Sequence, residues 1–126
     1  MSTATVSTLF DLAQVCWALP SVEWSRRYAG PRPAAAAARA KGLENPGRSI
    51  EARARLQRSI RWVDALVPGG RDCYRRALLE MTLDAGAARE PLMLGLRADG
   101  RPRSGHAWLA SAPDGARGDY DCVLSV

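Results

Sequence analysis

A cysteine stands at the start of a helix-like segment in the stretch "GGRDCYRRALLEM", Gly69 to Met81. The Gly-Gly pair favours a turn, and the residues after Asp72 and Cys73 have the pattern of a helix. A cysteine on the first turn of a helix lies at the positive end of the helix dipole, which favours the thiolate over the thiol. The position of Cys73 therefore suits a nucleophile.

A base for this thiol is available in His106, the one histidine of the chain, which lies in "GHAW". A strand that begins there can place the imidazole over the N-terminus of a packed helix. The ring also needs a group that fixes its orientation and tautomer, as in other catalytic triads. Asp119 and Asp121 are the candidates, and because they are two residues apart on a strand they could face the same way. The expected order is Cys, His, Asp.

The N-terminal half of the chain is expected to be helical. Ser7 or Thr8 can cap a helix that runs to about Ala18, and Pro20 favours its end there. Cys16 lies with apolar neighbours on one face of this helix, so we expect it in the core.

Three more helices are expected before the strands. The alanine-rich run in "AGPRPAAAAARAKGLENPG" favours a short helix. An apolar spacing of three and four residues predicts an amphipathic helix from Ser49 to about Leu66. The helix that carries Cys73 is expected to run from Asp72, its N-cap, to about Ala85, with Gly86 at its end.

The C-terminal part reads as strands. The segments 91–97, 105–111 and 120–126 are separated by turn sequences and predict an antiparallel meander. Helices first and strands last favour an α+β domain in which the helices pack on one face of a small sheet.

The bulk properties limit the class of protein. A chain of 126 residues forms one domain, 1–126, with a helical lead-in at 1–68 and the Cys-His-Asp residues within 69–126. Three cysteines without a CxxC spacing favour neither a disulfide framework nor a zinc site, so we expect no metal, no cofactor and a reducing cytoplasm. Asp11 and Gln14 interrupt the N-terminal apolar stretch, which predicts neither a signal peptide nor a membrane span.

The charge is uneven along the chain. The net charge is +5, and the whole excess lies in residues 1–70. Runs of Lys and Arg never exceed two residues and no aromatic residues interleave with them, so we expect no nucleic-acid partner. The basic half is a candidate docking face for an acidic partner or peptide.

The segments "CYRRALLEMTLDAGA", "LMLGLRADG" and "SGHAWLASAPDG" together resemble the transglutaminase-like domain of the lasso-peptide biosynthesis B proteins. The family pattern is approximately Cys-Leu-x-Arg-Ala-Leu, an Ile-Gly-Val strand, and His-Ala-Trp followed by a glycine turn. The N-terminal "LAQVCWALPSVEWSRRYAG" and "RSIRWVDALVPGGRDC" are similar to the lead-in of the same family, so the resemblance covers nearly the whole chain.

This resemblance implies a papain-like cysteine peptidase that removes the leader from a ribosomally made precursor peptide. It makes Cys73 the nucleophile, His106 the base and Asp119 the orienting acid, and it favours Arg76 over Arg75 as the arginine that supports the thiolate. Where the family continues with Val and Glu after His-Ala-Trp, this chain has Leu109 and Ala110. Its last turn is also slightly longer, which leaves Asp121 as the alternative to Asp119.

The resemblance also implies partners. They are the precursor peptide, a separate leader-recognition protein, since the peptidase pattern fills the chain, and an asparagine-synthetase-like lasso cyclase. Two other functions stay open at this point. The same thioester chemistry serves a transglutaminase-like acyl or amide transfer, and a domain of this type can also be a non-catalytic peptide-binding module.

Overall fold

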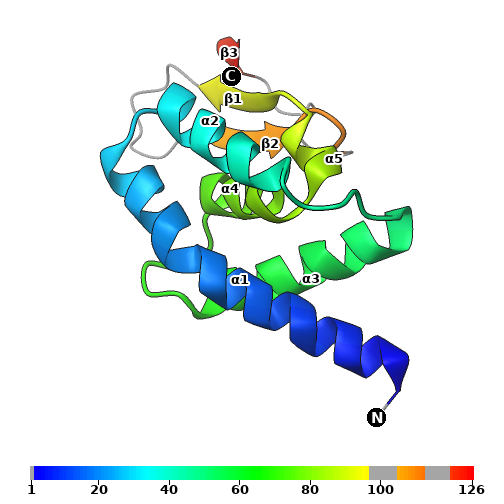
Figure 1. Ribbon diagram of the computed structural model, residues 1–126. Coiled ribbons are helices and arrows are strands. Elements are labelled where there is room, and N and C mark those ends of the chain that lie inside the picture. Colours follow the sequence, from blue (N-terminus) through cyan, green and yellow to red (C-terminus); the bar gives the residue numbers. More distant parts are fainter. Residues whose placement is uncertain (1, 97–104, 113–119) are drawn as a thin grey trace.

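The computed structural model describes residues 2–96, 105–112 and 120–126 (Figure 1). These residues form five helices followed by three strands, so the domain is α+β, with its helices first as expected. The elements are α1 (Thr3–Tyr28), α2 (Pro31–Gly42), α3 (Ile50–Leu66), α4 (Cys73–Leu83), α5 (Ala85–Ala88), β1 (Leu92–Leu96), β2 (His106–Leu109) and β3 (Cys122–Ser125).

The first helix is longer than its sequence predicts. It begins after Ser2, whose side chain caps it, and it continues through Pro20 for eight further residues, so the prediction that it ends before this proline is wrong. An internal proline removes one helical hydrogen bond and costs about 3 kcal/mol. Val15 and Val22, on either side of Pro20, are both buried in the core, and this packing keeps the helix continuous. Within the part of the chain that the structure describes, no helix combines the length and apolarity needed to cross a lipid bilayer.

The buried face of α1 differs from the expected one. Cys16 is exposed, so its prediction as a core residue is wrong. The residues of α1 that are buried follow another helical line, namely Asp11, Val15, Ala18 and Val22. Because Cys16 is adjacent to Val15, it is turned by about 100° from that line.

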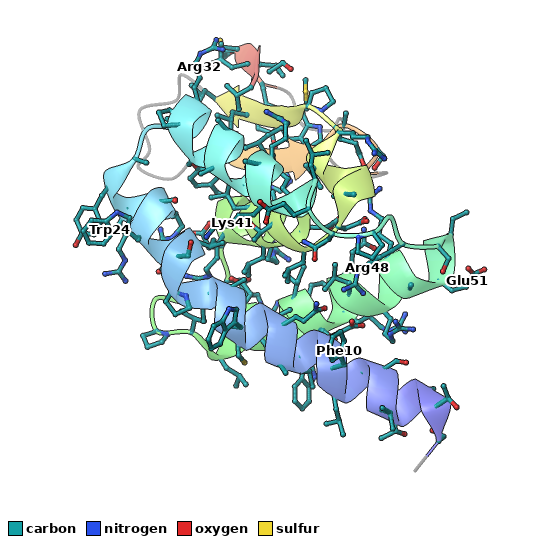
Figure 2. All side chains as sticks on the ribbon, in the orientation of Figure 1. Phe10, Trp24, Arg32, Lys41, Arg48 and Glu51 are labelled. Carbon is teal, nitrogen blue, oxygen red and sulfur yellow. The ribbon has the colours of Figure 1, made fainter. Side chains whose placement is uncertain are left out.

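A second apolar stripe runs along the outer face of α1. Its members repeat at intervals of four and seven residues, which places them on one side of a helix, and all are exposed: Val6, Phe10, Trp17, Trp24 and Tyr28. Trp17 is 90% exposed. Figure 2 shows Phe10 and Trp24 pointing away from the other helices. A helix that is apolar on two faces is usually covered on both.

The middle helices agree with their predictions except at the end of α4, because Gly86 lies inside a separate helix. The alanine-rich segment forms α2, and it lies so close to α4 that a Cβ on Gly42 would meet the carbonyl oxygen of Met81 at 1.8 Å. The predicted amphipathic helix forms α3, and the side chain of Ser49 caps its start. The next helix, α4, begins at Cys73 but stops at Leu83, because Asp84 caps the short helix α5.

The sheet is antiparallel with the strand order β2-β1-β3, so the prediction of a meander is wrong. The central strand is β1, which pairs with β2 on one side and with β3 on the other. Leu92 of β1 exchanges both backbone hydrogen bonds with Val126, at 3.0 and 2.8 Å. The outer edge of β2 is thereby left to face the start of α4 instead of another described strand.

Candidate active site

The start of α4 presents Cys73 together with the backbone N–H groups of its first turn. Asp72 caps the helix as predicted, and its side chain accepts the N–H of Arg75 at 2.9 Å. Its carbonyl oxygen accepts the N–H of Arg76 at 3.1 Å. The N–H groups of Cys73 and Tyr74 also lie in the first turn, and no described residue accepts a hydrogen bond from them. Such donors can stabilise an oxyanion that forms next to the sulfur.

The sulfur of Cys73 contacts the edge of the sheet. The backbone N–H of Ala107 donates a hydrogen bond to Cys73 Sγ at 3.3 Å. A hydrogen bond donated to sulfur stabilises negative charge on it. Sequence analysis did not find this donor, because it depends on β2 being an edge strand beside α4.

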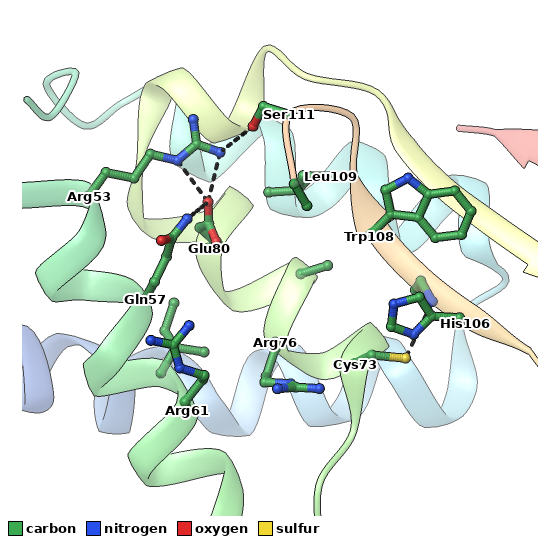
Figure 3. A pocket seen from close by; sticks show the side chains of 14 residues that line it. Arg53, Gln57, Arg61, Cys73, Arg76, Glu80, His106, Trp108, Leu109 and Ser111 are labelled. Atoms are coloured by element: carbon green, nitrogen blue, oxygen red, sulfur yellow. Dashed lines mark hydrogen bonds and ion pairs between the residues drawn. The ribbon is translucent and has the colours of Figure 1, made fainter. Parts of the chain in front are cut away.

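His106 is the first residue of β2, directly before this donor. Figure 3 shows its imidazole beside the sulfur of Cys73. Burial lowers the pKa of His106 below its ordinary value, and the nearby positive charge of Arg76 lowers it further. The neutral imidazole is therefore favoured, which is the form that can accept a proton from a thiol. The structure thus brings two of the three expected residues together.

Two aromatic rings stack with the imidazole of His106. Its ring stacks on Trp108 with centroids 5.6 Å apart and on Tyr120 at 6.5 Å. Tyr120 lies over Gly95, where an added Cβ would approach the ring to 2.6 Å. Since Gly95 pairs with His106 across the sheet, this glycine makes room for the stack. Tyr120 was missed by sequence analysis, although a glycine inside the strand "LMLGLR" was a signal of close approach.

The third residue of the expected triad is not decided by the structure. Asp119 lies outside the described residues. Asp121 is exposed, and its backbone N–H donates to the carbonyl oxygen of Leu96 at 3.0 Å. The choice between the two carboxylates stays a prediction.

A buried arginine fixes the turn that precedes Cys73. Arg75 is 1% exposed, and its Nε donates to Asp64 Oδ1 at 2.7 Å. Its guanidinium also donates to the carbonyl oxygen of Gly70 at 2.6 Å and to Glu23 Oε1 at 3.1 Å. Asp64 accepts the backbone N–H of Asp72 as well, at 3.1 Å. The network therefore ties α1, α3 and the turn to the first residues of α4.

The carboxylate on α1 is strongly stabilised in this network. Hydrogen bonds from Arg26 and then from Arg75, against the opposing effect of burial, together lower the pKa of Glu23 to about 2. Arg75 thus stabilises the turn before α4, whereas Arg76 lines the hollow at Cys73. The expectation that Arg76 rather than Arg75 supports the thiolate stays a prediction.

Two hollows meet at the cysteine. One lies between α3, α4 and β2 and has a volume of about 350 Å³. The other lies beside the turn before α4 and the ends of β1 and β3, and measures about 700 Å³. The described residues that line both are Cys73, His106 and Ala107. A chain that passes from one hollow to the other would cross the sulfur.

Neither the described side chains nor known proteins add a further assignment. Within residues 2–96, 105–112 and 120–126, no three His, Cys, Asp or Glu side chains gather in a way that could hold a metal ion. No protein-family model, curated protein or solved structure matches the chain. The resemblance to the lasso-peptide B proteins therefore stays a prediction.

Proposed function

We propose that the chain is a cysteine peptidase of transglutaminase-like fold that removes the leader peptide from a lasso-peptide precursor. Cys73 is the nucleophile, His106 the base and Asp119 the residue that orients the imidazole. The observation that carries the proposal is the position of the Cys73 sulfur, which lies at a helix N-terminus, beside the imidazole and between two hollows.

The chemistry follows from these positions. His106 takes the proton of the Cys73 thiol, and the thiolate attacks the peptide carbonyl carbon to form a C–S bond. The oxyanion lies at the start of α4, where the N–H groups of Cys73 and Tyr74 can donate to it. His106 then returns the proton to the leaving amine as the C–N bond breaks. Water, deprotonated by the same imidazole, splits the thioester and restores the thiol.

The two hollows favour a chain-like substrate over a small molecule. A peptidase must hold residues on both sides of the bond that it cuts. The described hollows extend from Cys73 in two directions, toward Ser111 along β2 and toward Pro31 at the start of α2. A precursor peptide in an extended conformation would occupy both.

The proposed setting is the cytoplasm, with a separate leader-recognition protein that presents the precursor and an asparagine-synthetase-like cyclase that uses the product. The outer stripe of α1 supports a protein partner. The exposed fractions of the aromatic residues in this stripe correspond to roughly 600 Å² of accessible surface, because one aromatic side chain has about 150–250 Å². Trp62 and Leu66 of the adjoining α3 are exposed as well. A stable interface buries about 800 Å² per partner.

The test is incubation of the purified chain with the precursor peptide encoded beside its gene, followed by mass spectrometry of the products. We expect a single cut between leader and core. Cys73→Ala should abolish it, and Cys16→Ala, which changes an exposed thiol, should not. Binding of the precursor without any cut, in the presence of the recognition protein, would show a non-catalytic module instead.

The same experiment separates hydrolysis from acyl transfer. With an excess of a primary amine such as glycinamide, a peptidase yields mainly the free carboxylic acid, whereas a transferase yields mainly the amide adduct. A dominant adduct would replace the proposed hydrolysis by transfer and would keep Cys73 as the nucleophile.

A further inference from the structure

The hollow between α3 and β2 is a groove that begins at the proposed nucleophile. Cys73 and His106 lie at one end, and Ser111 and Ala112 lie at the other. The first turns of α4 form its floor, and α3 forms the wall that faces β2 (Figure 3). The outer edge of β2 pairs with no described strand, but part of it is already used, since the N–H of Ala107 donates to Cys73 Sγ and the carbonyl oxygen of Leu109 accepts the N–H of Ala112.

The far end of the groove has more carboxylates than guanidinium groups near it. Arg53 projects there from α3, and its guanidinium makes ion pairs with Glu80 at 2.7 Å and with Glu90 at 2.5 Å. Asp84 lies 3.5 Å from the same guanidinium. These carboxylates satisfy Arg53, so it is not available to a ligand.

The end near Cys73 has an excess of positive charge. Arg61 and Arg76 line the same hollow from α3 and α4 (Figure 3). Arg61 makes no ion pair with the residues that the structure describes. Arg76 Nε lies 3.4 Å from Asp64, but that carboxylate already pairs with the buried Arg75 at 2.7 Å. One carboxylate therefore serves both Arg75 and Arg76, and Arg61 has none among the residues that the structure describes.

We propose that this groove binds the part of the substrate on one side of the scissile bond, and that Arg61 and Arg76 hold a carboxylate of that part. The inference rests on the proposed function for the position of the scissile bond. Two guanidinium groups in a hollow match the planar, bidentate geometry of a carboxylate. An acidic residue of the peptide, or a free C-terminal carboxylate, presents the same group.

A bound carboxylate would also change the pKa of His106, the proposed base. The positive charge of Arg76 helps to hold the pKa of His106 below its ordinary value, after the larger effect of burial. An anion paired with Arg76 offsets that charge, so the pKa of His106 should rise when an acidic peptide binds. A residue with only a structural role would not produce this shift.

The binding test uses the Cys73→Ala protein, in which no turnover occurs, and three fluorescein-labelled hexapeptides. One contains Glu and ends in an amide, the second has Gln in place of Glu, and the third is the Gln peptide with a free C-terminal carboxylate. Fluorescence anisotropy should show the Glu peptide binding about tenfold tighter than the Gln amide, as expected for one charge-assisted hydrogen-bonded pair. The preference should weaken as the salt concentration rises.

Variants assign the preference to the two arginines. Arg61→Gln and Arg76→Gln should each reduce it, and the double variant should remove it. Arg58→Gln, which changes an exposed arginine of the same helix α3, should leave it intact. Equal binding of all three peptides, or a preference that survives in the double variant, would overturn the proposal. Tight binding of the third peptide would identify the chain terminus as the source of the carboxylate.

Two further readouts separate this proposal from the function on which it rests. In the Cys73→Ala protein, the Glu peptide should raise the pKa of His106, and with Arg76→Gln added it should not. An acidic preference without any cleavage by the unmodified chain would refute the peptidase and keep the anion site. Cleavage without an acidic preference would support the peptidase and refute the anion site.

Discussion

Cys73 is half-buried, whereas Cys16 and Cys122 are exposed. Access alone therefore favours modification of the other two thiols, and any excess reactivity of Cys73 must come from its surroundings. Those surroundings are the N-terminus of α4, the N–H of Ala107 and the imidazole of His106. All three act in the same direction, because each either stabilises a thiolate or accepts the thiol proton.

Iodoacetamide labelling at neutral pH, read by peptide mapping, should find Cys73 the most reactive thiol in spite of its lower exposure. In urea, where the environments are lost, the three thiols should react at similar rates. Slower labelling of Cys73 than of Cys16 in the folded protein would contradict its assignment as an activated nucleophile.

The single histidine allows its protonation to be followed without ambiguity. Its ring C–H resonance in NMR should titrate with a midpoint below the ordinary value for histidine, because burial and Arg76 both lower the pKa of His106. In Arg76→Gln the midpoint should move upward, since one of these causes is removed. Peptidase activity should rise with pH through the same midpoint, because the base must be neutral. A midpoint unchanged by Arg76→Gln would show that this arginine does not act on the base.

The third triad residue can be assigned by a pair of isosteric changes. Asp119→Asn should keep the fold and lose most of the cleavage rate, because an amide cannot stabilise the imidazolium and can hold the wrong tautomer. Asp121→Asn should be mild, and it serves as the matched control. The reverse ranking would move the assignment to Asp121. Near-normal rates in both variants would leave only a dyad, to be tested with His106→Ala.

At the scale of elements, local signals predicted the helices that carry the site, and tertiary contacts decided the rest. Ser49 and Asp72 mark the starts of α3 and α4, because an N-cap side chain accepts a backbone N–H only three residues further along the chain. The course of α1 through Pro20 depends on packing at Val15 and Val22, which no local signal reports. The strand order could not be predicted from the sequence either, because the order of antiparallel strands depends on pairing between residues far apart in the chain.

The Arg75 network is the element-scale feature that most directly positions Cys73. Arg75→Leu removes the closer partner of the buried Asp64 and leaves it only Arg76, at 3.4 Å, as a nearby cation. Removal of one partner of a buried ion pair typically costs about 3–5 kcal/mol. Urea unfolding should show a loss of this size, whereas Arg71→Leu, at an exposed position in the same turn, should cost less than about 0.5 kcal/mol. Similar stabilities of the two variants would mean that the network does not hold the turn before α4.

At the scale of the whole molecule, the candidate active site and the exposed apolar stripe lie on different surfaces. The site occupies the junction of α4 with the sheet, while the exposed apolar stripe follows the outer face of α1. A large apolar surface that takes no part in the core usually marks an interaction site. In the proposed function its partner is the separate leader-recognition protein, which would raise the local concentration of the precursor at Cys73.

This division predicts that the partner's effect can be removed without damage to the chemistry. The isolated chain should process the precursor slowly, and the recognition protein should accelerate it mainly at low precursor concentration. Trp17→Glu places a charge in the middle of the stripe, at a side chain that is 90% exposed, so the fold and the slow basal rate should be unchanged while the acceleration is lost. Ile50→Glu, at another exposed apolar side chain outside the stripe, is the control and should leave the acceleration intact. Full activity of the isolated chain at low precursor concentration would contradict the need for a partner, and acceleration that persists in Trp17→Glu would place the partner on another surface.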